Sequence, residues 1–298
     1  MEVFGLRQDE HEIAHRTVAV ECSNGGIMRK IALTAMVCLL TGIVSAGTVA
    51  DLEAMQAASK NIQHQFTFEG TPGSTGSWLN NKVASSPGLT QDGFEDPART
   101  ADQMSPGYDE TTAFADFSAL ASGVKGDALK SSATITYATS GTIEYLVRFG
   151  PMNVSSVLIG GSGSGPTARL RFLLTDKTGS KVMIQLGENV AHDLIGGETS
   201  VAYGESGDWY YVAQNWSISG GTVTMDAWVA NLTTGGLLTK TIDGASNAFV
   251  GDTATILNLG GSAKRFAECG LDALAIYNSP LNEATILSHF NTIATTPQ

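Results

Sequence analysis

The chain has 298 residues, 34 of them glycine, with only 15% charged residues and a formal net charge of −12. This acidic balance excludes nucleic acid as a partner, because no excess of Lys and Arg exists to replace phosphate counterions. A Gly-rich, weakly charged chain with β-branched segments is typical of an exported all-β protein, and this one is long enough to bury a sizeable core.

Residues 11–15 read HEIAH, which matches the H-E-x-x-H motif of zinc metalloproteases. On a helix this spacing places two imidazoles on one face, where they can bind zinc, with the Glu as general base. No third ligand follows at a suitable distance, since the next histidine is His64. The motif also precedes an export signal, with no domain around it. We therefore interpret it as spurious and expect no enzyme activity from it.

Residues 28–46 have the three parts of a bacterial secretory signal peptide. Arg29-Lys30 is a positive start, a long apolar run follows, and small residues stand at the cleavage position. Cleavage after Ala46 and cleavage after Ala50 both fit this pattern. The mature chain is then expected to be secreted, either to the periplasm or to the cell surface, without a transmembrane span.

A signal peptide normally begins at the initiator methionine, whereas this one begins at Met28. We therefore predict that residues 1–27 are an N-terminal extension included through a wrong choice of start codon. Of the three cysteines, only Cys269 lies beyond the signal segment, so no intrachain disulfide is expected. Cys269 is expected to be a small buried hydrophobic residue rather than a nucleophile.

The mature chain begins with a leader, residues 47–64, which has helical spacing and is either a short helix or a mobile segment. Residues 65–69 alternate and predict a first strand. Residues 70–116 are poor in apolar side chains and form a loop-rich insertion, either surface loops or partly disordered. Closely spaced strands with Gly-bearing turns then follow, at residues 132–137, 141–149, 155–159, 168–175, 181–186, 209–216, 222–230, 237–242, 256–259 and 270–277.

Many short strands without alternating helices predict an all-β fold, an antiparallel two-sheet jelly-roll sandwich. A short C-terminal helix is expected at residues 282–290, where apolar residues recur with helical spacing, and residues 293–298 form a tail. Alternation in the last strand predicts one face with Leu271, Ala273, Ala275 and Tyr277. The other face is predicted to hold Asp272, Leu274 and Ile276. Both sets are largely apolar, which suits a strand covered on each side.

The C-terminal stretch GLDALAIYNSPLNEATIL, residues 270–287, resembles the closing signature of laminin G-like, concanavalin A-like jelly rolls. The segment WYYVA at residues 209–213 is similar to a strand of the same family, and QFTFE at residues 65–69 to its opening strand. The resemblance covers roughly residues 65–292. It implies a bacterial secreted jelly-roll domain that binds carbohydrate in a lectin-like manner.

In the family that the chain resembles, the aspartate matching Asp272 often helps to hold a structural calcium ion. The resemblance implies Glu69 and the carbonyl groups around Gly126 as further oxygen ligands, which suit calcium. The residues themselves show only a carboxylate inside an apolar strand, which must be paired or bind a cation. Hydrogen bonds to the backbone or an arginine partner are the alternatives to calcium.

Aromatic residues concentrate in WYYVAQNW, residues 209–216. Aromatic faces stack on sugar rings, so exposed members of this cluster can form a saccharide platform. Alternation puts Trp209 and Tyr211 on one face and Tyr210 and Trp216 on the other. Trp209 matches a core position of the family, so Tyr210 and Trp216 are the candidate ligand-binding residues, with burial in the core as their alternative.

The closely spaced acidic strand of jelly-roll glucanases is absent, and Glu144 stands alone in its predicted strand. A glycoside hydrolase needs two carboxylates across the scissile bond and is therefore the weakest hypothesis. We expect a non-catalytic module that binds carbohydrate or a cell-surface glycan. The alternative is a structural or protein-interaction protein of the cell envelope, without a sugar ligand.

Overall fold

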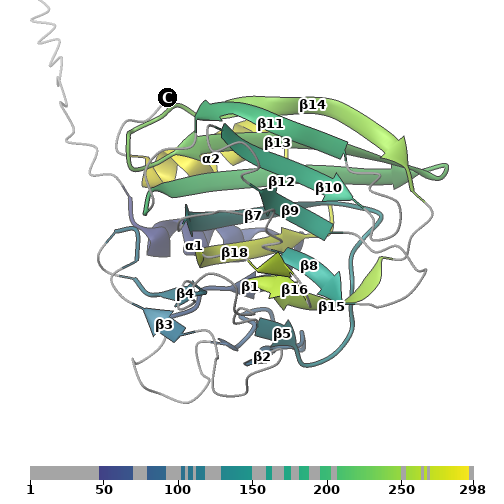
Figure 1. Cartoon of the computed structure of the whole chain (residues 1–298). Coiled ribbons are helices and arrows are strands. Elements are labelled where there is room, and N and C mark those ends of the chain that lie inside the picture. The colour runs from purple at the N-terminus through teal and green to yellow at the C-terminus, as the bar shows by residue number, and fades with distance from the viewer. Residues whose placement is uncertain are drawn as a thin grey trace, which may run out of the picture. The chain divides into compact units, whose positions relative to one another are not determined.

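The computed structural model (Figure 1) describes fourteen stretches of the chain, all after the predicted signal peptide. The predicted extension 1–27, the segment 28–46 and the end of the tail lie outside them. The described residues are 47–69, 79–91, 102–104, 107–109, 112–117, 129–149, 159–162, 171–175, 181–187, 195–202, 207–249, 253–262, 265–266 and 269–294.

The first of two large antiparallel sheets has the strand order β14-β13-β12-β7-β18-β4-β3, with β1 paired to β18. Its centre is formed by three long strands that hydrogen-bond over most of their length, β12, β7 and β18. The strands are β1 (Ile62–Phe66), β3 (Asp102–Met104), β4 (Phe114–Asp116), β7 (Ser140–Phe149), β12 (Trp209–Ser219), β13 (Thr222–Asn231), β14 (Thr239–Ala248) and β18 (Cys269–Tyr277).

The second sheet has the order β11-β10-β9-β8-β15-β5-β2, with β6 paired to β15. A short hairpin of β16 and β17 follows β15. The strands are β2 (Leu89–Gln91), β5 (Leu129–Ser131), β6 (Ile135–Thr136), β8 (Ile159–Ser162), β9 (Arg171–Thr175), β10 (Lys181–Gly187), β11 (Ile195–Ala202), β15 (Ala254–Leu259), β16 (Gly261–Ser262) and β17 (Arg265–Phe266).

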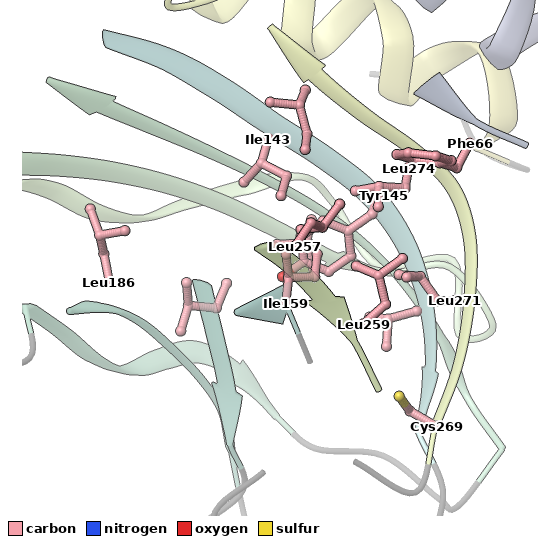
Figure 2. Packing of buried hydrophobic residues seen from close by; sticks show 14 of the residues in the cluster. Phe66, Ile143, Tyr145, Ile159, Leu186, Leu257, Leu259, Cys269, Leu271 and Leu274 are labelled. Carbon is pink, nitrogen blue, oxygen red and sulfur yellow. The ribbon is translucent and has the colours of Figure 1, made fainter. Parts of the chain in front are cut away.

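The main core lies between the two sheets, as Figure 2 shows for the residues around Tyr145 and Leu257. Alternate residues of β7 point into it, because successive side chains of a strand face opposite sides. Residues of both sheets meet there, among them Ile143, Val147, Ile159, Leu186, Leu259, Leu271 and Leu274. This arrangement confirms the predicted jelly-roll sandwich.

Two helices cover the outer face of the first sheet, α1 (Val49–Ala58) and α2 (Glu283–Ile293). The N-terminus of α1 is closed by a capping box between Thr48 and Asp51, and that of α2 by the side chain of Asn282. A second apolar cluster fills the space beneath them, joining the helices to outward-facing side chains of β7, β12, β13 and β18. Both faces of the central strands β7 and β18 are therefore buried, whereas the edge strand β14 is largely exposed.

The predicted leader 47–64 contains α1 and the start of β1, which are packed on the sandwich with Val49 and Leu52 fully buried. The loop-rich stretch 70–116 contains three short strands that the sequence analysis missed, as it missed β11. The predicted C-terminal helix is confirmed as α2. Among the described residues, no helix combines the length and the apolar character that crossing a bilayer requires.

Candidate cation and ligand-binding site

Tyr210 and Trp216 are both in the inter-sheet core, with exposed fractions of 0% and 1%. The Tyr210 ring packs against Phe149 at 5.0 Å between centroids, and the indole nitrogen of Trp216 donates to the carbonyl oxygen of Ala138 at 3.0 Å. A sugar cannot reach either ring. The predicted platform on these residues was wrong, because the second sheet covers one face of β12 and the helices cover the other.

The last strand departs from simple alternation at a β-bulge between Asp272 and Ala275, where the register with β7 shifts. Ala273 has a φ of 46°, in the left-handed region that a non-glycine residue rarely adopts. The bulge places Leu271 in the inter-sheet core with Leu274, whereas Ala273 and Ala275 face the helices. The predicted common face for Leu271 and Ala273 was wrong for this reason.

Asp272 is one of three carboxylates whose oxygens lie within 4.8 Å of one another, the others being Glu53 and Glu69. Glu69 follows β1, and Glu53 belongs to α1, a segment that sequence reasoning did not connect with the site. One oxygen of Glu69 accepts a hydrogen bond from the Ala113 amide at 2.8 Å. Like Ala273, Phe68 has a positive φ, 56°, so two of the three carboxylates are next to strained backbone.

Two oxygens of this carboxylate cluster are buried without a hydrogen-bond partner among the described residues, Oδ2 of Asp272 and Oε1 of Glu53. Asp272 has an exposed fraction of 0%, and its other oxygen accepts from the Ala273 amide at 2.7 Å. A buried carboxylate oxygen left unpaired is costly, and pairing with a cation removes the cost.

Burial and mutual repulsion act on all three carboxyl groups. Burial, assisted by the charge of Glu69, raises the pKa of Glu53 to about 8. Burial and the charge of Glu53 raise the pKa of Asp272 well above its usual range, and burial also raises that of Glu69. A positive charge at the centre of the cluster would oppose these shifts, because an opposite charge favours the ionised form of a carboxyl group.

The cluster has the geometry and donor chemistry of a divalent-cation site. Two oxygens that are each about 2.4 Å from a calcium ion can be at most about 4.8 Å apart, which all three carboxylates satisfy. Three carboxylate oxygens also match the preference of calcium for hard oxygen ligands. The structure thus brings together Asp272 and Glu69, two of the three predicted ligands, whereas Gly126 lies outside the described residues.

A pocket of about 550 Å³ opens at the N-terminal end of α1, next to the turn before β12. Its aromatic wall is formed by Tyr108 and Trp209, whose rings meet edge to face at 6.4 Å, and Phe114 packs on the other side of Trp209 at 5.3 Å. The polar wall holds Asp109 and two threonines. The complete lining is Gly47, Thr48, Tyr108, Asp109, Gly207, Trp209, Leu232, Thr233 and Ile293.

Asp109 connects the pocket to α1. Its Oδ2 accepts from the amide of Val49 at 2.7 Å, which satisfies one of the amides left free at a helix N-terminus. Its Oδ1 accepts from the amide and the hydroxyl of Thr112, which holds the turn in shape. Arg148 contacts the pocket residue Gly207, to whose carbonyl its Nε donates at 3.3 Å, and its guanidinium lies over the ring of Phe114.

Glu144, the isolated acid of β7, is fully buried beneath α2. Its oxygens accept from the hydroxyls of Tyr211 and Tyr277, at 2.5 and 2.8 Å, and lie about 3 Å from Nδ1 of His289. These contacts attach α2 to the sheet and leave the carboxylate out of reach of a substrate.

Cys269 is buried as predicted, and this burial is the main reason that the pKa of its thiol is raised well above the normal value.

No protein-family model matches the sequence, and no curated protein matches it either. Solved structures do match. Domain 4 of AbnA, an extracellular arabinanase from Geobacillus stearothermophilus solved with arabinotriose, aligns with a TM-score of 0.52 at 13% identity, over 77% of this chain and 98% of that one. This similarity supports the jelly-roll-like β-sandwich fold.

Two more distant structures also align with parts of the chain. A heptameric pentraxin from Limulus polyphemus aligns with a TM-score of 0.41 at 14% identity, over 57% of this chain and 78% of that one. A sialidase from Trypanosoma rangeli aligns with a TM-score of 0.45 at 13% identity, over 82% of this chain and 37% of that one. Neither adds to the fold assignment at that distance.

Proposed function

We propose that the chain is an exported, non-catalytic module that binds carbohydrate in the pocket between Tyr108, Trp209 and the N-terminus of α1. The observation that carries the proposal is the composition of that pocket. An aromatic wall next to carboxylate, hydroxyl and backbone groups suits a sugar, which has apolar C–H faces and a rim of hydroxyls. Its volume, about 550 Å³, is sufficient for a short oligosaccharide.

A structurally similar protein supports carbohydrate as the ligand class. Domain 4 of AbnA was solved with arabinotriose, and this chain covers nearly all of that domain. Fold similarity alone is a weak basis for function, so the pocket chemistry carries more of the argument. A hydrolase is not proposed, because Glu144 is enclosed by α2 and its partners.

We further propose that the module belongs to the laminin G-like branch of the concanavalin A-like jelly rolls and holds one structural calcium ion. The closing signature at residues 270–287 supports the branch. The cluster of Glu53, Glu69 and Asp272 supports the ion. When bound, calcium would supply the positive charge that the three carboxylates lack. The signal-peptide pattern at residues 28–46 supports export to the periplasm or the cell surface.

A glycan array with the mature chain, taken to begin at Gly47 so that the pocket residues Gly47 and Thr48 are present, tests carbohydrate binding in calcium-containing buffer, with arabino-oligosaccharides included among the probes. The informative pair of variants is Tyr108→Ala, which removes the ring, and Tyr108→Phe, which removes only a hydroxyl 3.5 Å from the Ile293 carbonyl. We expect Tyr108→Ala to weaken binding at least about tenfold, as for loss of a stacking ring worth about 1.4 kcal/mol, and Tyr108→Phe to bind like the wild type.

If the folded wild-type protein binds no glycan on the array, the carbohydrate proposal is contradicted and the structural envelope role is favoured. If binding is strong but insensitive to Tyr108→Ala, the site lies elsewhere. Circular dichroism spectra of both variants must match the wild type, so that a loss of binding is not a loss of folding.

A further inference from the structure

Helix α1 contributes to both candidate sites, because its N-terminus and its middle face different chemistry. Thr48, its N-cap residue, lines the pocket together with Gly47. Glu53, one turn further along, reaches the carboxylate cluster beneath. The position of one ten-residue helix therefore determines both the wall of the pocket and the third carboxylate of the cluster.

Contacts that are independent of charge hold the helix along one face, where the side chains of Gln65 and Thr292 donate to the Glu53 carbonyl and to Sδ of Met55. Only Val49, Leu52 and Gln56 are buried along its length, and the Gln56 amide donates to the Ala273 carbonyl at 3.0 Å. An isolated helix of this length is marginal in water, so α1 depends on its tertiary contacts. Without a cation, any of the three carboxyl groups that ionises faces two other acidic groups, and the repulsion acts against docking of the helix.

The acidic cluster alone would not identify a cation site. The independent observation is Asp272, a fully buried carboxylate whose Oδ2 lacks a hydrogen-bond partner among the described residues and lies within 4.8 Å of the other two groups. Its position results from the bulge at Ala273, which turns this part of β18 toward α1. A cation there would contact the sheet through Asp272 and the helix through Glu53.

We propose that a divalent cation bound by Glu53, Glu69 and Asp272 fastens α1 to the sandwich and thereby orders the pocket wall at Gly47 and Thr48. Glu53 is the positioning residue, since it alone of the three belongs to the helix. The inference rests on the calcium site of the proposed function and adds to it a coupling between cation and pocket. It does not require the cation to touch the sugar.

The test combines titration calorimetry with calcium chloride and amide hydrogen exchange of the mature chain, with calcium or with EGTA. We expect calcium to slow exchange in residues 49–58 by about tenfold or more and to leave residues 283–293 unchanged, since α2 is held by Glu144 and His289. In Glu53→Gln, calcium binding is expected to weaken and the calcium-dependent protection of residues 49–58 to vanish. Glu283→Gln, on the exposed face of α2, is the charge-matched control and should behave like the wild type.

Two outcomes would overturn the coupling while leaving the calcium site intact. In one, calorimetry detects calcium but exchange in residues 49–58 is the same with calcium and with EGTA. In the other, Glu53→Gln keeps the full calcium-dependent protection of the wild type. A flat calorimetric titration of the wild type would overturn both the calcium site and the coupling, whereas a loss of glycan binding alone would leave the coupling standing.

Discussion

Nδ1 of His289 lies 3.0 Å from Oε2 of Glu144, and both side chains are buried between α2 and the first sheet. Burial alone would lower the pKa of the imidazole, but the hydrogen bond and the charge of Glu144 outweigh it and raise the pKa. The hydroxyl groups of Tyr211 and Tyr277 complete the shell around the carboxylate. The His289–Glu144 pair thus attaches the C-terminal helix to the sheet, in addition to the apolar packing of α2.

This pair predicts that stability falls as the pH rises above neutrality. His289 has a higher pKa in the folded state than in the unfolded chain, so its contribution is complete below about pH 6.5 and is lost as the pH passes the folded-state value. Urea unfolding from pH 6 to pH 9 should therefore give a falling midpoint in the wild type and a flatter profile in His289→Gln.

Other groups also titrate, so the wild type and His289→Gln must be compared under one calcium condition. Glu53, with a pKa of about 8, favours the fold at low pH, as do Asp272 and Glu69, whose pKa values are also raised. His64, whose pKa burial lowers to about 4, acts in the opposite direction below about pH 6.5. Equal slopes in the two proteins above pH 6.5 would refute the role of His289.

Gly141→Ala is predicted to destabilise the protein strongly. Gly141 faces the carbonyl oxygen of Tyr277 and the ring of Trp216, and a methyl group there would overlap with both. Overpacking of a core typically costs about 1–3 kcal/mol, which thermal unfolding would detect as a lowered midpoint. Gly220→Ala is the comparison, since its methyl would meet nothing within 4 Å and only the positive φ of 57° opposes it. A cost for Gly141→Ala no larger than for Gly220→Ala would contradict this reading of the packing.

The architecture could be predicted from local patterns, because strand alternation and helical spacing are properties of neighbouring residues. The alternation of β12 correctly assigns Tyr210 and Trp216 to one face and Trp209 and Tyr211 to the other. What it cannot indicate is how much of each face is covered. That depends on the second sheet, which covers the face with Tyr210 and Trp216, and on α1 and α2, which come from opposite ends of the domain and pack over the other face.

The carboxylate cluster could be predicted only in part, for the same reason. Asp272 is conspicuous as a charge in an apolar strand, but Glu53 has no such signal, because an acid in a short amphipathic segment usually faces solvent. The contact between them depends on the bulge at Ala273, and a positive φ at an alanine has no sequence signature. Tyr108 and Asp109 were hidden in the stretch 70–116, which lacks periodicity.

Calcium is predicted to raise the melting temperature of the mature chain. A ligand that binds only the folded state stabilises it by about 1–2.3 kcal/mol at about 5 to 50 times its dissociation constant, which is a few degrees for a domain of this size. Scanning calorimetry with 5 mM calcium and then with excess EGTA, about 5 mM being well above the dissociation constants of extracellular sites, should show a reversible shift. An identical midpoint in both buffers would count against the calcium site. Magnesium, which prefers a smaller octahedral shell, should give a smaller shift.

Asp272→Asn separates the effect of the cation from that of packing, because the amide keeps the shape and the Oδ1 acceptor for the Ala273 amide while removing the charge. In EGTA the variant should be more stable than the wild type, by about 1–3 kcal/mol, because the wild type must either bury an unpaired charge near Glu53 and Glu69 or take up a proton at Asp272 on folding. In calcium the order should reverse, since the wild type gains the ion and the variant does not. Asp243→Asn, at an exposed carboxylate paired with Lys240, should change stability by less than about 0.5 kcal/mol in either buffer. A variant that is less stable than the wild type in EGTA would mean that Asp272 is satisfied by the protein itself, without a cation.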